Sequence, residues 1–125
     1  MTHFESEEDY LERILMLSKE KANVRAIDIA ASMNFSKPSV SIALKKLKEK
    51  LYVNVEESTG FITLTEQGLS IASSVYERHQ IIAKLLMSLG VSEETALKDA
   101  CKIEHDLSDE TFDAIKKHFN KYDLK

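Results

Sequence analysis

The sequence predicts a mainly α-helical protein in which an N-terminal winged helix-turn-helix, residues 1–65, precedes a helical domain, residues 66–125. Three observations carry this prediction. The chain of 125 residues contains only three glycines and one proline, which favours helices joined by short loops. Apolar residues recur at helical spacing over most of the chain. One stretch, residues 52–65, instead alternates as a β-hairpin does, directly after two short helices.

The first helix is predicted over residues 6–20, with Ser6 as its N-cap and acidic residues in the first turn, where they suit the helix dipole. Its apolar stripe consists of Tyr10, Ile14 and Leu17. Asp9, Glu12 and Met16 share a different stripe of the same helix.

The next two predicted helices, residues 25–33 and 36–51, are separated by a break that contains Pro38. Ser36 can cap the second of them, and proline is tolerated in a first helical turn because no hydrogen bond is lost there. The expected core residues are Ile27, Ile29, Ala30 and Met33 on the first helix and Val40, Leu44, Leu47 and Leu51 on the second. Two short helices joined by a tight turn predict a helix-turn-helix.

The free face of the second helix is basic and rich in hydroxyl groups. Residues 21–55 carry seven bases and two acids, a net charge of +5, although the whole chain has a net charge of −4. A basic segment of this kind is typical of a surface that binds a polyanion, but a solvated lysine-rich helix gives the same count. The residues predicted to contact double-stranded DNA are Ser36, Lys37, Pro38, Ser39, Ser41, Ile42, Lys45, Lys46 and Lys48.

The hairpin over residues 52–65 would be the wing of the helix-turn-helix. Its alternating residues are Val53, Val55, Phe61 and Thr63, with a turn at residues 57–60. Thr65 should then cap a helix of roughly six turns that ends near Ser88. Ser92 and Ser108 are expected to cap two further helices.

The long helix carries more apolar surface than one small domain needs to cover. Its main stripe consists of Ile71, Ala72, Val75, Ile82, Ala83 and Leu86. Ile81 and Leu85 form a second apolar edge. We expect this surface to form a homodimer contact.

Three side chains after Ser92 have the chemistry of metal ligands. Cys101, Glu104 and His105 lie at offsets of three and four, so a helix places them on one stripe. Thiolate, carboxylate and imidazole all bind first-row transition metals. A half-buried border between the apolar and polar faces is the commoner explanation for such a trio taken alone.

Two other features of the sequence also have side chains that can bind a metal. His79 lies within the apolar stripe of the long helix, where a lone histidine is more often a core residue held by one hydrogen bond. Asp9 and Glu12 form a carboxylate pair three residues apart, which alone would usually be a solvated acidic turn.

Taken together, these segments resemble the diphtheria-toxin-repressor and manganese-transport-regulator family in its short, two-domain form. The similar segments are EEDYLERILML for the first helix, IAASMNFSKPSVSIALKKL for the helix-turn-helix, and GFITLTEQGLSIA for the wing and the start of the dimer helix. YERHQIIAKLL and DACKIEHDLSDE are similar to the metal-binding helices of the family. These last two segments are the specific ones, since winged helices are widespread.

The resemblance implies a metal-activated, sequence-specific transcriptional repressor, not an enzyme, that binds a palindromic operator as a homodimer and controls manganese or iron homeostasis. It implies the metal ligands Asp9, Glu12, His79, Cys101, Glu104 and His105. The manganese branch typically has two carboxylates on the first helix and Glu at position 101. The iron branch typically has Cys at that position and lacks the pair. This chain therefore mixes the two patterns.

The mixed donor set bears on the choice of metal. The carboxylates suit Mn²⁺ or Fe²⁺, whereas the Cys101 thiolate favours Fe²⁺, Co²⁺ or Zn²⁺ over Mn²⁺. We expect Mn²⁺ or Fe²⁺ in the cell, and Co²⁺ or Zn²⁺ as further activators in vitro. The ancillary site of the iron branch needs a Glu and a His where this chain has Ala83 and Leu97, so we expect that site to be absent.

The sequence leaves two other function classes open. One is a metal-independent winged-helix regulator with a structural Cys/Glu/His cluster, and the weaker one is a small carboxylate–histidine metalloenzyme. The chain has no apolar run long enough to span a bilayer, and its acidic start is unlike a signal peptide. We therefore expect a cytoplasmic protein.

Overall fold

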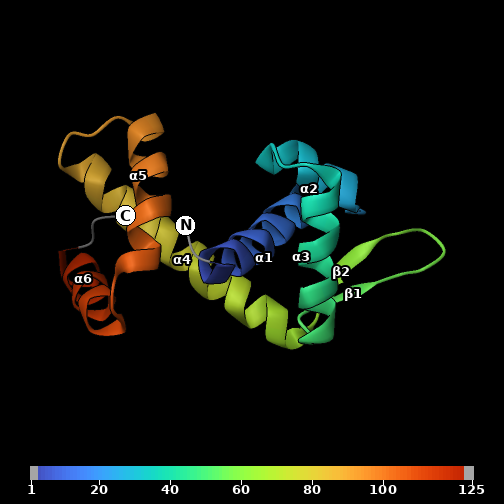
Figure 1. The fold of residues 1–125 in the computed structure, drawn as a ribbon. Coiled ribbons are helices and arrows are strands. Elements are labelled where there is room, and N and C mark those ends of the chain that lie inside the picture. The colour runs from blue at the N-terminus through green and yellow to red at the C-terminus, as the bar shows by residue number, and fades with distance from the viewer. Residues whose placement is uncertain (1–2, 123–125) are drawn as a thin grey trace. The chain divides into compact units, whose positions relative to one another are not determined.

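The computed structural model describes the backbone of residues 3–122 and the side chains of residues 7–119 (Figure 1). The order of its elements is α1 (His3–Glu20), α2 (Ala26–Met33), α3 (Lys37–Glu49), β1 (Val53–Val55), β2 (Ile62–Leu64), α4 (Glu66–Ser88), α5 (Glu93–Asp106) and α6 (Asp109–Tyr122). The chain forms two compact units that divide between Ser73 and Ser74, within α4. No helix in the described part of the chain combines the length and the apolarity needed to cross a membrane.

The N-terminal unit encloses one apolar core between α1, α2, α3 and the hairpin. Its buried side chains are Tyr10, Leu11, Ile14, Val24, Ile29, Ala30, Val40, Leu44, Leu47, Val53, Ile62 and Ala72. Full burial of each large apolar side chain stabilises the fold by about 1.5–3 kcal/mol. The hairpin is held to the segment before α2 by the amide of Ile62, which donates to the Val24 carbonyl at 2.7 Å.

The predicted helix-turn-helix is confirmed. Asn34 ends α2 in the left-handed region at φ 58°, and Ser36 caps α3 by accepting the Ser39 amide at 3.3 Å. Pro38 lies in the first turn of α3, where its missing N–H leaves no partner unsatisfied. The turn therefore follows from the chemistry of a few local residues.

Three details of the predicted helices are wrong. The first helix begins at His3, so Ser6 lies within it and not at its N-cap. Ile27 was expected in the core but is 54% exposed, since Ile29 and Ala30 fill the inner face of α2. Leu51 was expected on the stripe of α3 but is 69% exposed with φ 64°, because the chain reverses there towards β1.

The wing is present, but the alternation of its second strand falls on other residues than predicted. β1 and β2 pair antiparallel with Val53 opposite Leu64 and Val55 opposite Ile62. Ile62 is buried and Thr63 is exposed, so the alternation falls on Ile62 and Leu64, one residue away from the predicted Phe61 and Thr63. The cause is the turn, which closes between Glu56 and Phe61 and has Gly60 at φ 77°, so that it fixes the register.

The start of α4 is fixed by two local features. The Thr65 hydroxyl accepts the Gly68 amide at 3.0 Å, which confirms the predicted cap, and it donates to the Leu51 carbonyl at 2.7 Å. Gly68 lies so close to the Tyr52 carbonyl that a β-carbon at this position would clash with main-chain atoms. This close approach requires glycine.

The C-terminal unit consists of the second half of α4 with α5 and α6. Ile82 and Ala83 of α4 pack on Ala100 of α5. The predicted caps are confirmed, since Ser92 accepts the Thr95 amide at 3.4 Å and Ser108 accepts the Thr111 amide at 3.1 Å.

Candidate metal centre and nucleic-acid interface

The three candidate ligands of α5 lie close together. The Cys101 sulfur, a carboxylate oxygen of Glu104 and a ring nitrogen of His105 are all within 4.8 Å of one another. The side chains of Glu104 and His105 are only 1% and 6% exposed. Glu104 and His105 are therefore more deeply buried than a border between polar and apolar faces would be, whereas Cys101 is half-buried.

His79 is a further candidate ligand, from α4. One of its ring nitrogens lies within 4.8 Å of a carboxylate oxygen of Glu104. Its Nε2 is 3.0 Å from the Leu97 carbonyl oxygen, which can only accept a hydrogen bond. Nε2 therefore donates this hydrogen bond, and a bond of this kind can orient an imidazole whose other nitrogen binds a metal.

The donor chemistry of this cluster fits a divalent cation. Burial of a carboxylate is favourable only where its charge is compensated, and the groups of its own unit that lie near Glu104 include two imidazoles and a thiol, which together can bind a cation with it. The Nε2 atom of His105 is 3.8 Å from the nearer Glu104 oxygen, which is longer than a hydrogen bond. Ligands about 2.0–2.3 Å from one ion are separated by less than 4.8 Å, and Glu104 has an oxygen within that distance of a ring nitrogen of His79 and of the ligand atoms of Cys101 and His105.

Asp9 and Glu12 belong to the other unit. They lie three residues apart on α1, where Asp9 is half-buried and Glu12 is 5% exposed. The neighbouring Tyr10 is buried, and this burial raises the pKa of its hydroxyl. Glu12 is thus a buried acid next to the apolar core of the N-terminal unit.

All nine residues predicted to contact DNA are exposed on α3 or at its cap. Val40, Leu44 and Leu47 are buried on the opposite face of the helix, which leaves the basic, hydroxyl-rich face outward. The Ser36 hydroxyl, which caps α3 by accepting the Ser39 amide, also donates to the Ser39 hydroxyl at 2.9 Å.

A groove of about 360 Å³ runs along this face between α1 and α3. Its lining consists of Glu7, Tyr10, Phe35, Ser39, Ile42, Ala43 and Lys46. Sequence reasoning missed Phe35, which is 40% exposed and could have been noticed as an aromatic residue within a polar turn. It also missed the ion pair in which the Lys50 ammonium donates to the Glu7 carboxylate at 2.7 and 2.8 Å, which raises the pKa of Lys50.

Fold and site together define a winged-helix DNA-binding protein whose second unit carries a cluster of metal-ligand side chains. Residues 3–61 match the iron dependent repressor family's N-terminal DNA binding domain, and residues 65–124 match its metal binding and dimerisation domain. The chain belongs to this family of metal-dependent repressors, which includes the DtxR and MntR proteins. It is a metal-responsive DNA-binding transcriptional repressor and not an enzyme. Its C-terminal half is the domain through which proteins of this family form dimers.

Individual relatives agree with this assignment. An uncharacterised HTH-type transcriptional regulator of Methanocaldococcus jannaschii is 39% identical over 120 residues, which cover 94% of this chain and 95% of the relative. The transcriptional regulator MntR of Escherichia coli is 37% identical over 118 residues, covering 94% of this chain and 76% of MntR.

Among solved structures, the manganese regulator SloR superposes with a TM-score of 0.80 at 32% identity over 91% of this chain. The Thermoplasma acidophilum protein IdeR gives a TM-score of 0.80 at 27% identity over 90% of this chain. The chain spans about half of each of these two proteins, 53% in both cases.

Proposed function

We propose that this repressor is activated by Fe²⁺ or Mn²⁺, binds a palindromic operator as a homodimer in the cytoplasm, and controls the cellular supply of the activating metal. The observation that carries the proposal is the cluster of His79, Cys101, Glu104 and His105 within the C-terminal unit. Membership of the family supports the link between metal and DNA binding.

The proposed ligand set adds the acids of α1 to that cluster. Its members are Asp9, Glu12, His79, Cys101, Glu104 and His105. A cation bound by both groups would neutralise the acids and tie α1, the helix before the helix-turn-helix, to the metal-binding unit. In a homodimer this restrains the spacing of the two recognition helices, which must match half-sites about one DNA turn apart or a multiple of it. Allosteric coupling of this kind is typically ~1–3 kcal/mol.

For DNA we propose that the first turns of α3 enter the major groove. Ser39 and Ser41 can hydrogen-bond to base edges, and Ile42, which is 60% exposed, can contact a thymine methyl group. The remaining groove-facing positions are Ser36, Lys37 and Pro38, and the proposed phosphate contacts are Lys45, Lys46 and Lys48.

The identity of the metal depends on Cys101. The two acids of α1 with Glu104 make an oxygen-rich set that suits Mn²⁺ and Fe²⁺, and the thiolate shifts preference towards Fe²⁺. We therefore propose Fe²⁺ or Mn²⁺ as the activating ion, with Co²⁺ and Zn²⁺ as effective substitutes in vitro.

The test compares DNA binding with and without Mn²⁺, Fe²⁺ and Zn²⁺ for the wild type, His79→Ala and Glu104→Ala. Each metal is expected to strengthen binding by the wild type and to lose that effect in both variants. Glu94→Ala is the matched control, because it removes an exposed acid from the same helix at its ion pair with Lys98. Metal-independent binding that survives both substitutions would contradict the proposal and favour a structural role for the cluster.

A further inference from the structure

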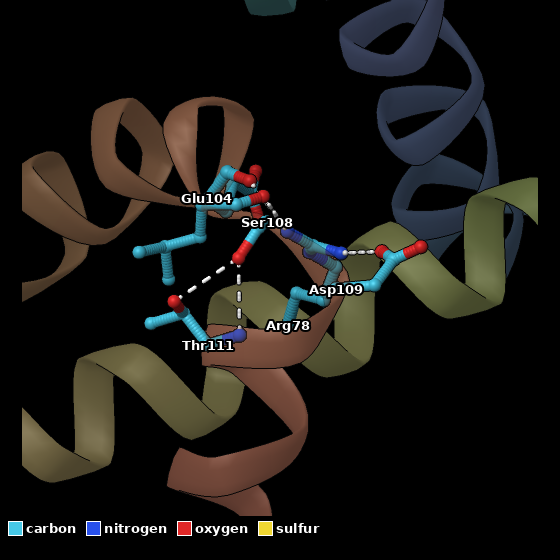
Figure 2. A network of polar contacts seen from close by, with 6 residues as sticks. Arg78, Glu104, Ser108, Asp109 and Thr111 are labelled. Carbon is cyan, nitrogen blue, oxygen red and sulfur yellow. Dashed lines mark hydrogen bonds and ion pairs between the residues drawn. The ribbon is translucent and has the colours of Figure 1, made fainter.

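Arg78 joins the three helices of the C-terminal unit through one side chain (Figure 2). Its Nη2 donates to the main-chain carbonyls of Glu104, at 3.0 Å, and Leu107, at 2.9 Å. Its Nη1 donates to the Asp109 carboxylate at 3.1 Å. The guanidinium also lies 4.9 Å from the centroid of the Phe112 ring, and the side chain is only 17% exposed.

The two carbonyls that accept from Arg78 lie at the C-terminal end of α5, where main-chain carbonyls lack helical partners. The last four carbonyls of a helix have no amide partner within it, and Glu104 lies in the last turn of a helix that ends at Asp106. A cation at this end also suits the helix dipole. Because the guanidinium is a rigid planar fork, its bonds fix both the position and the direction in which α5 ends.

We propose that Arg78 is a positioning residue for the metal centre, setting the distance between the ligands of α4 and those of α5. It directly precedes His79 in the chain and bonds the main chain of Glu104, so its side chain links one ligand to another. This inference rests on the proposed function, since it concerns the same cluster. Removing a partner that orients metal ligands typically lowers metal affinity ~10–100-fold.

The chain provides two controls for the ion pairs around Arg78. The Lys116 ammonium donates to the carboxylate of Glu77, the residue before Arg78, at 3.1 Å. This second ion pair joins α6 to α4, the same two helices as the Arg78–Asp109 pair, but does not include the carbonyl bonds that Arg78 makes to Glu104 and Leu107. The Asp109 side chain is 94% exposed, so its ion pair with Arg78 contributes little. Lys116→Met and Asp109→Asn therefore remove inter-helix charge pairs without touching the carbonyl bonds.

Phe112→Leu is a third control, because it disturbs the packing under the guanidinium and leaves both carbonyl acceptors in place.

The experiment measures Mn²⁺ and Co²⁺ affinity of the full chain by competition with a chromophoric chelator, together with the thermal unfolding midpoint without metal. Arg78→Lys keeps the charge but loses the fork, and we expect it to bind both ions ~10–100-fold more weakly. The three controls should stay within about threefold, as expected for exposed pairs and a volume change away from the ligands. Phe112→Leu is expected to lower the unfolding midpoint nonetheless.

A second measurement separates positioning from stability. The Co²⁺ absorption spectrum is recorded at saturating Co²⁺, where ligand binding keeps the variant folded. A displaced ligand set should change the band positions of Arg78→Lys and leave those of Phe112→Leu at wild-type values.

Wild-type affinity and spectrum in Arg78→Lys, or an equal loss in Phe112→Leu, would overturn the role of Arg78 and leave the proposed function intact. A wild-type chain that binds neither ion would overturn both.

Discussion

The two units of the chain are held together by different means. The N-terminal unit has a continuous apolar core, with twelve buried side chains in the described residues. The apolar cluster that joins α4 to α5 contains three, Ile82, Ala83 and Ala100, and two of these are alanines. Beside it lie the buried Glu104 and the main-chain bonds of Arg78. The N-terminal unit thus has one large apolar core, whereas α4 and α5 meet over a small apolar cluster that has a buried acid and an arginine beside it.

The largest expected effect is on the apolar core. Leu47 is fully buried, so Leu47→Ala should lower the free energy of unfolding by about 2–5 kcal/mol in urea or guanidinium titrations. Leu51→Ala is the matched control, because that side chain is 69% exposed and should change stability by less than ~0.5 kcal/mol. Equal effects of the two substitutions would mean that the core does not carry the stability of this unit.

The next largest effect is expected on the metal preference of the C-terminal unit. Cys101→Glu replaces the soft donor with a carboxylate and should raise the ratio of Mn²⁺ to Zn²⁺ affinity by at least ~10-fold, because hard oxygen ligands suit Mn²⁺ better than thiolate does. The ratio is obtained from competition titrations with the two ions. An unchanged ratio would contradict the assignment of Cys101 as a ligand.

A smaller change is expected at the DNA-binding face. Lys45→Ala should weaken binding to all duplexes alike and reduce the slope of log affinity against log salt by about 1, since one phosphate contact is lost. Lys98→Ala removes an exposed lysine of the other unit and should leave the slope unchanged. A change in sequence preference with an unaltered slope would instead make Lys45 a base-reading residue.

The smallest effect concerns the start of α2. Asp28 accepts hydrogen bonds from Lys21 at 2.7 Å and from the Arg25 amide at 2.9 Å, and these bonds lower its pKa. A carboxyl group whose pKa is lowered in the folded state stabilises the protein at pH values above its unfolded pKa of about 4. This stabilisation is lost as pH falls through the folded pKa. Asp28→Asn should thus lose less than ~1 kcal/mol at neutral pH, because solvent screens this pair.

Denaturant titrations of Asp28→Asn and the wild type from pH 7 downwards check this expectation. The difference between the two should vanish in acid. A difference that persists or grows in acid would exclude the ion pair as its cause.

The parts of the fold that depend on neighbouring residues could be predicted from the sequence. The caps at Thr65, Ser92 and Ser108 are examples, because a hydroxyl three residues before a free amide is a local pattern. The exposure of Ile27 and Leu51 could not be predicted, since it depends on which neighbours fill the core. The alternating set Phe61 and Thr63 was wrong by one residue, because the turn at Gly60 decides which residues of β2 are buried.

The candidate site divides in the same way. The ligand types and their helical spacing are local, so the trio of α5 could be proposed before the structure. Arg78 could not be, because its acceptors are main-chain carbonyls 26 and 29 residues away, which have no sequence signature. The domain division at residues 65 and 66, the ligand roles of all six candidate metal ligands and the DNA contacts of α3 stay predictions.

The central claim is that metal binding in one unit controls DNA binding by the other, and thermodynamic reciprocity tests it most directly. The measurement is the Mn²⁺ affinity of the wild-type chain with and without a saturating duplex selected from a random pool. The account expects the duplex to raise Mn²⁺ affinity by ~5–150-fold, the same factor by which Mn²⁺ raises affinity for the duplex. Equal Mn²⁺ affinity with and without DNA would contradict it.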